Sequence, residues 1–205
     1  MILILSGGIG SGKSVAAGML NQMYGFPVYC ADRRVKELYG EHPTLLNDIE
    51  KELVCSLRDK HGDFSPAALA REVFAGGDAL EKVEALVFPV LKDDFASWMN
   101  GNPSSVHILE SATILEKEYF RGFGELALVV TAPSDVRLAR AMKRDSADEE
   151  QVKARIQKQK MMNDIALLRQ FCSLPFEVCE NIGTTDELRS KLAEFVEKYV
   201  LTKML

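Results

Sequence analysis

The chain has 205 residues, enough for one well-formed core with inserted segments and fewer than two full domains usually need. Its net charge of −5 disfavours a nucleic acid as the main partner, because proteins that bind nucleic acids usually carry a basic surplus. The apolar runs are far shorter than the ~20 residues that cross a bilayer, and the first residues lack the basic segment of a secretory signal. We therefore expect a cytoplasmic protein with no membrane partner.

The N-terminal part of the chain alternates strand and helix patterns. The run ILILS at 2–6 is apolar throughout, as in a strand buried on both faces of a parallel sheet. From Lys13 onward apolar residues recur at helical spacing, and we expect Gly25 to end this helix. FPVYC at 26–30 indicates a second strand, and ADRRVKELYG indicates a second helix that ends at Gly40.

The middle of the chain, residues 43–99, has no convincing strand pattern. It predicts three helices, and we expect Pro89 to bend or split the last of them because proline lacks the backbone N–H that a helix interior needs. The three helical segments are 44–57, 65–77 and 78–99.

The C-terminal part returns to alternating patterns. Strands are expected at 106–109, 126–131 and 176–180. Two strongly basic helical segments lie between the second and third of these strands, at 134–145 and 149–171. A final helix opens at Thr184, whose spacing to Glu187 fits a capping box. The residues of this helix expected to face the core are Leu188, Leu192, Phe195, Val196 and Tyr199.

This alternation predicts an α/β fold with an open parallel five-stranded sheet, covered by helices on both faces. We expect a nucleotide-binding core of a nucleotide-kinase-like type, built from 1–42, 100–135 and 173–205. Two helical insertions interrupt the core. We expect residues 43–99 to form an acceptor-binding lobe and residues 136–172 to form a lid.

The stretch SGGIGSGKS contains the full phosphate-loop (P-loop) pattern, Gly7, four residues, Gly12, Lys13 and Ser14, with a strand before it and a helix after it. Glycines let the backbone curl so that successive N–H groups point into one concavity, and the start of the helix adds partial positive charge there. The alternative is a glycine-rich turn that binds nothing.

We expect this loop to bind ATP, with Lys13 reaching the β- and γ-phosphates and the Ser14 hydroxyl ligating Mg²⁺. The loop residues expected to contact the nucleotide are Gly8, Ile9, Gly10, Ser11, Gly12, Lys13, Ser14 and Val15.

The phosphate loop alone does not choose among kinases, GTPases and motors. A GTPase should carry the guanine-selecting motif N-K-x-D, which the sequence lacks, and a large ATPase needs adjacent acids where VHILES offers only Glu110. A small kinase needs a carboxylate near the loop to accept the proton of an acceptor hydroxyl. Asp32 is the candidate, because the carboxyl ends of neighbouring strands face one crevice in an open α/β sheet. The alternative is that Asp32 only caps the helix after it.

Three arginines, Arg137, Arg140 and Arg144, stand at i, i+3 and i+7 and therefore share one face of a predicted helix. Arginines of a mobile lid commonly neutralise the charge that builds up on the γ-phosphate. The alternative is a solvated basic face that pairs with nearby acids such as Asp145 and Glu149.

Taken together, these features resemble the dephospho-coenzyme A kinase family, which catalyses the last step of coenzyme A synthesis. The resemblance runs nearly end to end. The segments that carry it are GGIGSGKS, YCADRRVKELY, LAREVFAGGDALEKVEALVFPVL, ILESATILE, LVVTAPSDVRLARAMKRD, VKARIQKQ and ENIGTTDEL. Where the family has Asp-Ala-Asp and His-Pro, this chain has Cys30-Ala31-Asp32 and Phe88-Pro89. In place of the family's Pro-Leu-Leu, this chain has Ala112-Thr113-Ile114. Its segment between Gln159 and Asn181 is about six residues longer than in the family.

The resemblance implies that the 3′-hydroxyl of the dephospho-CoA ribose attacks the γ-phosphate of ATP, with Asp32 as base and orienter. Lys13, Arg140, Arg144 and Mg²⁺ would stabilise the transition-state charge, and Asn181 would lie near the adenine. The residues implied for acceptor binding are Asp32, Arg71, Phe88 and Glu110. The expected protein is a monomer or weak homo-oligomer whose partner is the small molecule dephospho-CoA.

Two other functions stay open from the sequence. The chain could be another small P-loop kinase, acting on a nucleoside monophosphate or a sugar, in which only the 43–99 segment would differ. It could also be a non-catalytic regulator that binds nucleotide, which Cys30 and Phe88 favour because they depart from the family pattern.

Overall fold

The computed structural model describes residues 1–203 and divides the chain into two compact units. Residues 1–30 and the chain from 104 onward form the first, which we call the sheet unit, and residues 31–103 form the second, the helical unit. The 43–99 segment lies within the helical unit and the 136–172 segment within the sheet unit. Their roles as acceptor lobe and lid stay predictions.

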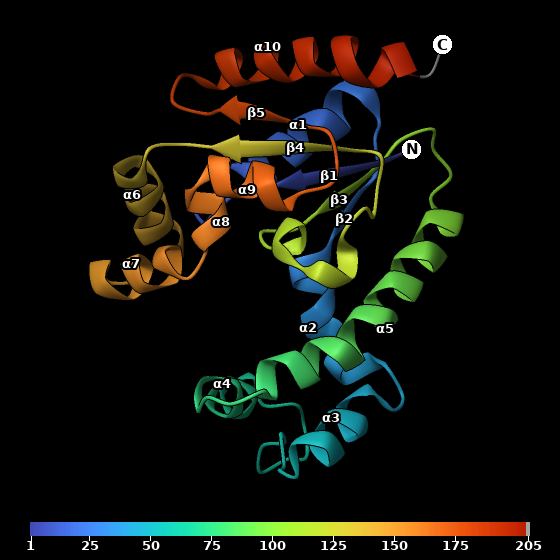
Figure 1. Cartoon of the computed structure of the whole chain (residues 1–205), viewed down its shortest axis with the longest axis vertical. Helices are drawn as coiled ribbons and strands as arrows, with labels where there is room; N and C mark the ends of the chain where they lie inside the picture. The colour runs from blue at the N-terminus through green and yellow to red at the C-terminus, as the bar shows by residue number, and fades with distance from the viewer. Residues whose placement is uncertain (204–205) are drawn as a thin grey trace. The chain divides into compact units, whose positions relative to one another are not determined.

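The sheet unit contains the predicted five-stranded sheet, in which every strand pair is parallel and the strand order is β2-β3-β1-β4-β5 (Figure 1). The strands are β1 Ile2–Ser6, β2 Val28–Cys30, β3 His107–Glu110, β4 Leu126–Thr131 and β5 Phe176–Glu180. Because β1 lies between β3 and β4, the loop that follows it leaves the sheet at the switch point where ligands bind in open α/β folds.

The sheet unit also contains helices, among them the predicted helix after the phosphate loop. They are α1 Lys13–Tyr24, α6 Ser134–Asp145, α7 Glu149–Gln157, α8 Lys160–Asn163, α9 Ile165–Phe171 and α10 Thr185–Phe195. Short helical turns lie at η1 Ile114–Glu116, η2 Glu118–Phe120, η3 Val196–Val200 and η4 Leu201–Lys203. The basic segment 149–171, which we expected to be one helical stretch, is three helices. Asp164 has extended backbone and its carboxylate accepts a hydrogen bond from the N–H of Leu167, so it caps a new helix instead of continuing the old one.

The core of the sheet unit forms where α1 and α10 pack on apolar residues of the sheet. Leu20 of α1 and Leu192 of α10 are fully buried in the same cluster as Leu3 and Leu5 of β1. As the sequence predicted, Thr184 and Glu187 form a reciprocal capping box at the start of α10. The predicted end of α1 is also confirmed, since Gly25 takes up a left-handed conformation there. Figure 1 shows α10 running alongside β5.

The helical unit is built around its longest helix, α5, which packs against the other three. Its helices are α2 Ala31–Glu41, α3 Leu45–Leu53, α4 Pro66–Phe74 and α5 Ala79–Gly101. Arg34 of α2 forms a two-pronged ion pair with Asp94 of α5, with both N–O distances at 2.9 Å, so a charged clamp supplements the apolar packing. None of the helices within residues 1–203, α5 included, has the length and apolarity that crossing a bilayer requires.

Three expected helix ends in this part of the chain were inaccurate. Gly40 does not end α2, which includes it and continues to Glu41. The helix expected over 44–57 stops at Leu53, and the one expected over 65–77 stops at Phe74. Of the bend or split expected at Pro89, the split does not occur, because the Ala85 carbonyl that loses its partner is on an exposed surface where water can satisfy it, while Val87 and Leu91 on either side of Pro89 are buried; a bend stays a prediction.

The residue that ends α3 generates a prediction about stability. Val54 has φ of 52° and ψ of 42°, a left-handed conformation that a β-branched side chain disfavours, yet it is 90% exposed and gains little from packing. We expect Val54→Gly to raise the free energy of unfolding of the helical unit by about 0.5–1 kcal/mol. Fluorescence of Trp98, the only tryptophan and a residue of the same unit, should report this in a urea titration.

Val54→Ala is the matched control, since it removes the branch but keeps a Cβ in the left-handed conformation. It should stabilise less than Val54→Gly. A lower unfolding midpoint for Val54→Gly would mean that the valine side chain makes stabilising contacts and would contradict the prediction.

Candidate functional site

The phosphate loop joins β1 to α1 and has the backbone that an anion site needs. The N–H of Ser11 donates to the carbonyl of Gly8 at 3.0 Å, which closes a tight turn. Gly12 has φ of 98°, and a Cβ there would collide with the side-chain amide of Asn181, so only glycine fits. The first N–H groups of α1 have no intrahelical acceptors, and the first turn of this helix carries no acidic residue. The loop therefore presents polarised donors without an acid in that turn to compete for them.

The tip of the loop is held from outside, at Ile9. Its N–H donates to the side-chain oxygen of Gln159 at 2.7 Å, and its carbonyl accepts from the guanidinium Nε of Arg137 at 2.9 Å. Its side chain packs against a small apolar cluster formed between α6 and α7, whose buried members are Ala141, Val152 and Ile156. The loop tip and the 136–172 segment are therefore joined by polar and apolar contacts.

The far side of the loop is held by Asn181, directly after β5. Its side-chain amide donates to the carbonyl of Ser11 at 2.8 Å, and its own N–H donates to the carbonyl of Thr131 at 2.7 Å. Arg140 donates to the Asn181 carbonyl at 3.1 Å. The structure thus brings two predicted site residues, Arg140 and Asn181, to the loop. A contact between Asn181 and adenine stays a prediction.

Glu110 lies at the carboxyl end of β3, next to the start of α1. Its carboxylate accepts a hydrogen bond of 2.5 Å from the hydroxyl of Ser14, and the ammonium of Lys13 lies 4.0 Å from the same oxygen. The Glu110 side chain is only 6% exposed. The resemblance assigned this residue to acceptor binding, whereas here it contacts the two loop residues expected at the phosphates and the metal.

The donor set at Ser14 and Glu110 suits a magnesium ion. Hydroxyl and carboxylate oxygens are hard ligands, and Mg²⁺ is usually bound by one or two protein groups together with waters and phosphates. Within residues 1–203, no group of three or more His, Cys, Asp or Glu side chains could hold a metal ion by itself. The residues therefore fit a metal that arrives with a nucleotide rather than a closed protein cage.

Two buried polar atoms at the loop have no hydrogen-bond partner, and they are the only such side-chain atoms among the described residues. They are the hydroxyl of Ser11 and one terminal nitrogen, Nη2, of Arg137. Buried polar groups are nearly always satisfied in folded proteins, so such atoms beside a phosphate loop are consistent with a site that a polar ligand completes. Arg137 and Gln159 were not among the predicted site residues, although they lie in the two predicted basic helical segments, 134–145 and 149–171.

The three arginines of α6 lie in three different environments. Arg137 is buried at the loop tip, Arg140 is half-buried at Asn181, and the Arg144 side chain is 56% exposed. Arg144 donates to the Asp145 carboxylate at 2.6 and 3.0 Å, and Arg155 donates to it at 2.7 Å. These hydrogen bonds hold the pKa of Asp145 well below its usual range. For Arg144 the structure therefore shows the acid-paired arrangement, and its catalytic role stays a prediction.

The remaining predicted residues, Asp32, Arg71 and Phe88, belong to the helical unit. Asp32 is exposed and is the second residue of α2, which begins at Ala31, so Asp32 is not the N-cap that the alternative required. Arg71 is exposed on α4, and its guanidinium lies 3.3 Å from the carboxylate of Glu72. Phe88 is half-buried on α5. The roles of these residues stay predictions.

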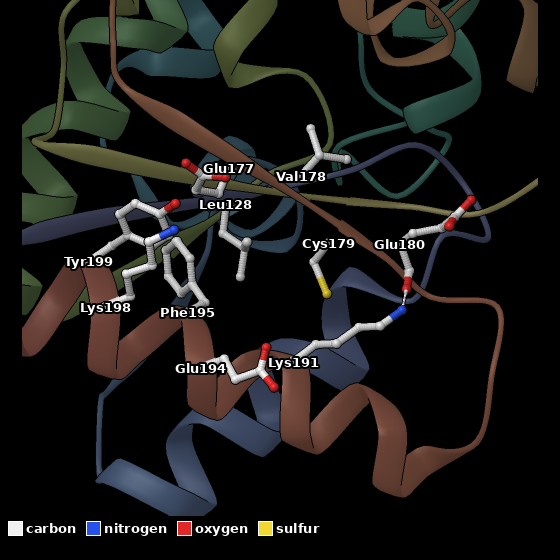
Figure 2. A pocket seen from close by; sticks show the side chains of 10 residues that line it. All are labelled: Leu128, Glu177, Val178, Cys179, Glu180, Lys191, Glu194, Phe195, Lys198 and Tyr199. Atoms are coloured by element: carbon white, nitrogen blue, oxygen red, sulfur yellow. Dashed lines mark hydrogen bonds between the residues drawn. The ribbon is translucent and has the colours of Figure 1, made fainter.

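A cavity of about 330 Å³ lies elsewhere in the sheet unit, between β5 and α10 (Figure 2). Lys191 extends along it and donates to the carbonyl of Glu180 at 2.7 Å, which satisfies one backbone acceptor of this edge strand. None of the predicted site residues lines this cavity. It is therefore not the nucleotide site that the phosphate loop predicts.

Comparison with known proteins assigns the chain to a family. The model of the dephospho-CoA kinase family matches residues 1–169. The chain is similar to the dephospho-CoA kinase of Porphyromonas gingivalis, with 34% identity over 162 residues that cover 79% of both chains. It is 31% identical over 201 residues to that of Chlorobaculum tepidum, covering 95% of this chain and 92% of the relative. A solved structure from Thermus thermophilus is 28% identical and superimposes with a TM-score of 0.78 over 97% of each chain. The chain therefore belongs to the dephospho-CoA kinase family.

Proposed function

We propose that this protein transfers the γ-phosphate of ATP to the 3′-hydroxyl of the dephospho-CoA ribose, giving coenzyme A and ADP. The observation that carries the proposal is the family match over residues 1–169, which includes the phosphate loop, Asp32, Glu110 and Arg140. The reaction forms a bond between the acceptor oxygen and the γ-phosphorus and breaks the bond to the bridging oxygen of ADP. The acceptor proton leaves to a base.

In the proposed reaction the sheet unit binds the nucleotide. The N–H groups of the loop and of the first turn of α1 hold the phosphates, and Lys13 places its charge on the β- and γ-phosphates. Ser14 and Glu110 would hold Mg²⁺, which supplies charge neutralisation at the phosphates when bound. Arg140, fixed at the Asn181 carbonyl, adds a further cation on the nucleotide side.

The acceptor side of the proposal assigns Asp32 as base and orienter. Asp32 is exposed in the first turn of α2, two residues after the end of β2, and it matches the last Asp of the family's Asp-Ala-Asp segment. The helical unit would bind dephospho-CoA, with Arg71 and Phe88 as candidate contacts. The 136–172 segment would exclude water, with Arg144 adding charge to the phosphates. We infer a cytoplasmic monomer or weak homo-oligomer that needs no nucleic acid or membrane.

The first test is the choice of acceptor. A coupled assay of ADP release should show turnover with dephospho-CoA and none above the ATPase background with nucleoside monophosphates or gluconate. Absence of turnover with millimolar dephospho-CoA would overturn the proposal. Transfer to one of the other acceptors would assign a different small kinase, and tight ATP binding without any transfer would assign a nucleotide-binding regulator.

The second test concerns Asp32. We expect Asp32→Asn to lower kcat by about 10²- to 10⁴-fold because the amide cannot accept the proton, while the Kd of ATP stays within about twofold. Asp186→Asn is the matched control, since Asp186 is also the second residue of a helix, α10, and is exposed. The control should keep full activity. Equal kcat values for Asp32→Asn and the wild type would remove Asp32 from the mechanism.

The third test concerns the hydroxyl–carboxylate pair at the start of α1. We expect Glu110→Gln to raise the Mg²⁺ concentration for half-maximal activity about tenfold or more, because the amide oxygen can still accept from the Ser14 hydroxyl but brings no negative charge to the metal site. Ser14→Thr keeps the hydroxyl and should stay within about threefold of the wild type. An unchanged Mg²⁺ requirement in Glu110→Gln would show that Glu110 serves another purpose, such as acceptor binding.

A further inference from the structure

Arg137 is a buried cation whose counter-charge is not a residue of the described chain. Only 6% of its surface is exposed, and its hydrogen bonds go to the neutral carbonyl of Ile9 and, at 2.8 Å, to the neutral side-chain oxygen of Asn163. No carboxylate within residues 1–203 forms an ion pair with it, and burial lowers its pKa. Charges are almost never buried in proteins without a partner, because desolvation costs more than such hydrogen bonds return.

The position of this guanidinium beside the phosphate loop indicates which kind of group could balance its positive charge. Nη2, the nitrogen that lacks a partner, packs against Gly8 so closely that a Cβ on residue 8 would collide with it. Nε holds the carbonyl of Ile9, the next residue of the phosphate loop. The other unsatisfied buried atom, the hydroxyl of Ser11, belongs to the same loop. The uncompensated charge therefore lies against the backbone of the loop that is expected to bind the phosphates.

We propose that Arg137 is a positioning residue of the phosphate site, whose buried charge is balanced by the phosphates of the bound nucleotide across the Gly8–Ile9 backbone. Arg137 touches the loop and not the ligand. It fixes the carbonyl of Ile9 so that the loop N–H groups keep their direction, and its charge adds to the field in the concavity. The inference rests on the nucleotide-binding part of the proposed function and does not involve the acceptor.

The location of Arg137 in the fold supports a role at the loop rather than in the core. It lies on α6. Asn163, whose side-chain oxygen accepts a hydrogen bond from Nη1 of Arg137, lies on α8. Asn163 is itself held through a hydrogen bond of 2.7 Å to the carbonyl of Ile156. The guanidinium is therefore fixed by two helices of the 136–172 segment and directed at the loop. A purely apolar side chain would fill the same space without the cost of desolvating a charge. Packing alone therefore does not explain why a charged residue stands here.

The test compares nucleotides with and without phosphate in calorimetric titrations free of Mg²⁺. We expect Arg137→Met and Arg137→Gln to weaken ADP and ATP binding about tenfold or more, and to leave adenosine within about twofold. Gln can still donate to the Ile9 carbonyl, so it separates the charge from the hydrogen bond. Arg137→Lys keeps the charge and should bind ADP within about threefold of the wild type.

The control and the ligand-free protein complete the design. Arg169→Met removes the same charge from α9, where Arg169 lies over the ring of Phe176, and should leave ADP binding unchanged. The unfolding midpoint of ligand-free Arg137→Met should equal or exceed that of the wild type, because an uncompensated buried charge is replaced by an apolar side chain.

Two results would overturn the inference. One is ADP binding of wild-type strength in Arg137→Gln. The other is loss of adenosine affinity by the same factor as ADP together with a lower unfolding midpoint, which would assign Arg137 a folding role only. Failure of the enzyme to phosphorylate dephospho-CoA would not affect either readout, so the inference and the proposed acceptor fail separately.

Discussion

A phosphate loop works only if its backbone N–H groups point inward, and this constraint determines the surroundings of the loop. Side chains inside the concavity would occupy the place of the phosphates, so the loop cannot be held from within. The contacts that hold it come from outside: Gln159 and Arg137 fix Ile9, and Asn181 fixes the carbonyl of Ser11. Each of these side chains forms a hydrogen bond with a backbone N–H or carbonyl of the loop. The loop is therefore preorganised before any nucleotide arrives, and binding does not have to order it.

The parallel sheet explains why residues so distant in sequence meet at this loop. Glu110 ends β3, Asn181 follows β5, and Arg137 lies on the helix that follows β4. All strands of the sheet run in the same direction, so the segments that leave their carboxyl ends emerge at the edge where the loop after β1 also emerges. The register reinforces this arrangement, because Leu5 of β1 lies opposite Glu110 and the Ser14 hydroxyl is within reach of its carboxylate. The fold thus places an acid, an amide and a buried cation around one turn of backbone.

The sequence predicted those parts of the molecule whose signals are local. The apolar run of β1, the left-handed Gly25 and the capping box at Thr184 all appear where the pattern placed them, since each depends on a few neighbouring residues. The breaks inside 149–171 and the continuity of α2 through Gly40 and of α5 through Pro89 were not predictable, because tertiary packing decides them. The same holds for the site. Helical spacing put Arg137 on one face with Arg140 and Arg144 but could not show that only Arg137 is buried against the loop, nor that Glu110 reaches Ser14.

The electrostatics of the ligand-free protein differ between the loop and the 136–172 segment, and the difference has a consequence for the proposed reaction. Arg137 is uncompensated and already fixed, so nothing has to break before its charge acts on a bound phosphate. Arg144 and Arg155 are bound to Asp145, and these ion pairs must open before either arginine reaches a nucleotide. Both arginines share the Asp145 carboxylate, whose side chain is 23% exposed, and Arg144 donates to it through two nitrogens, so opening these pairs costs more than opening an isolated exposed pair. In the proposed reaction the charge of Arg137 is therefore in place before the nucleotide binds, whereas Arg144 and Arg155 would reach the phosphates only after leaving Asp145.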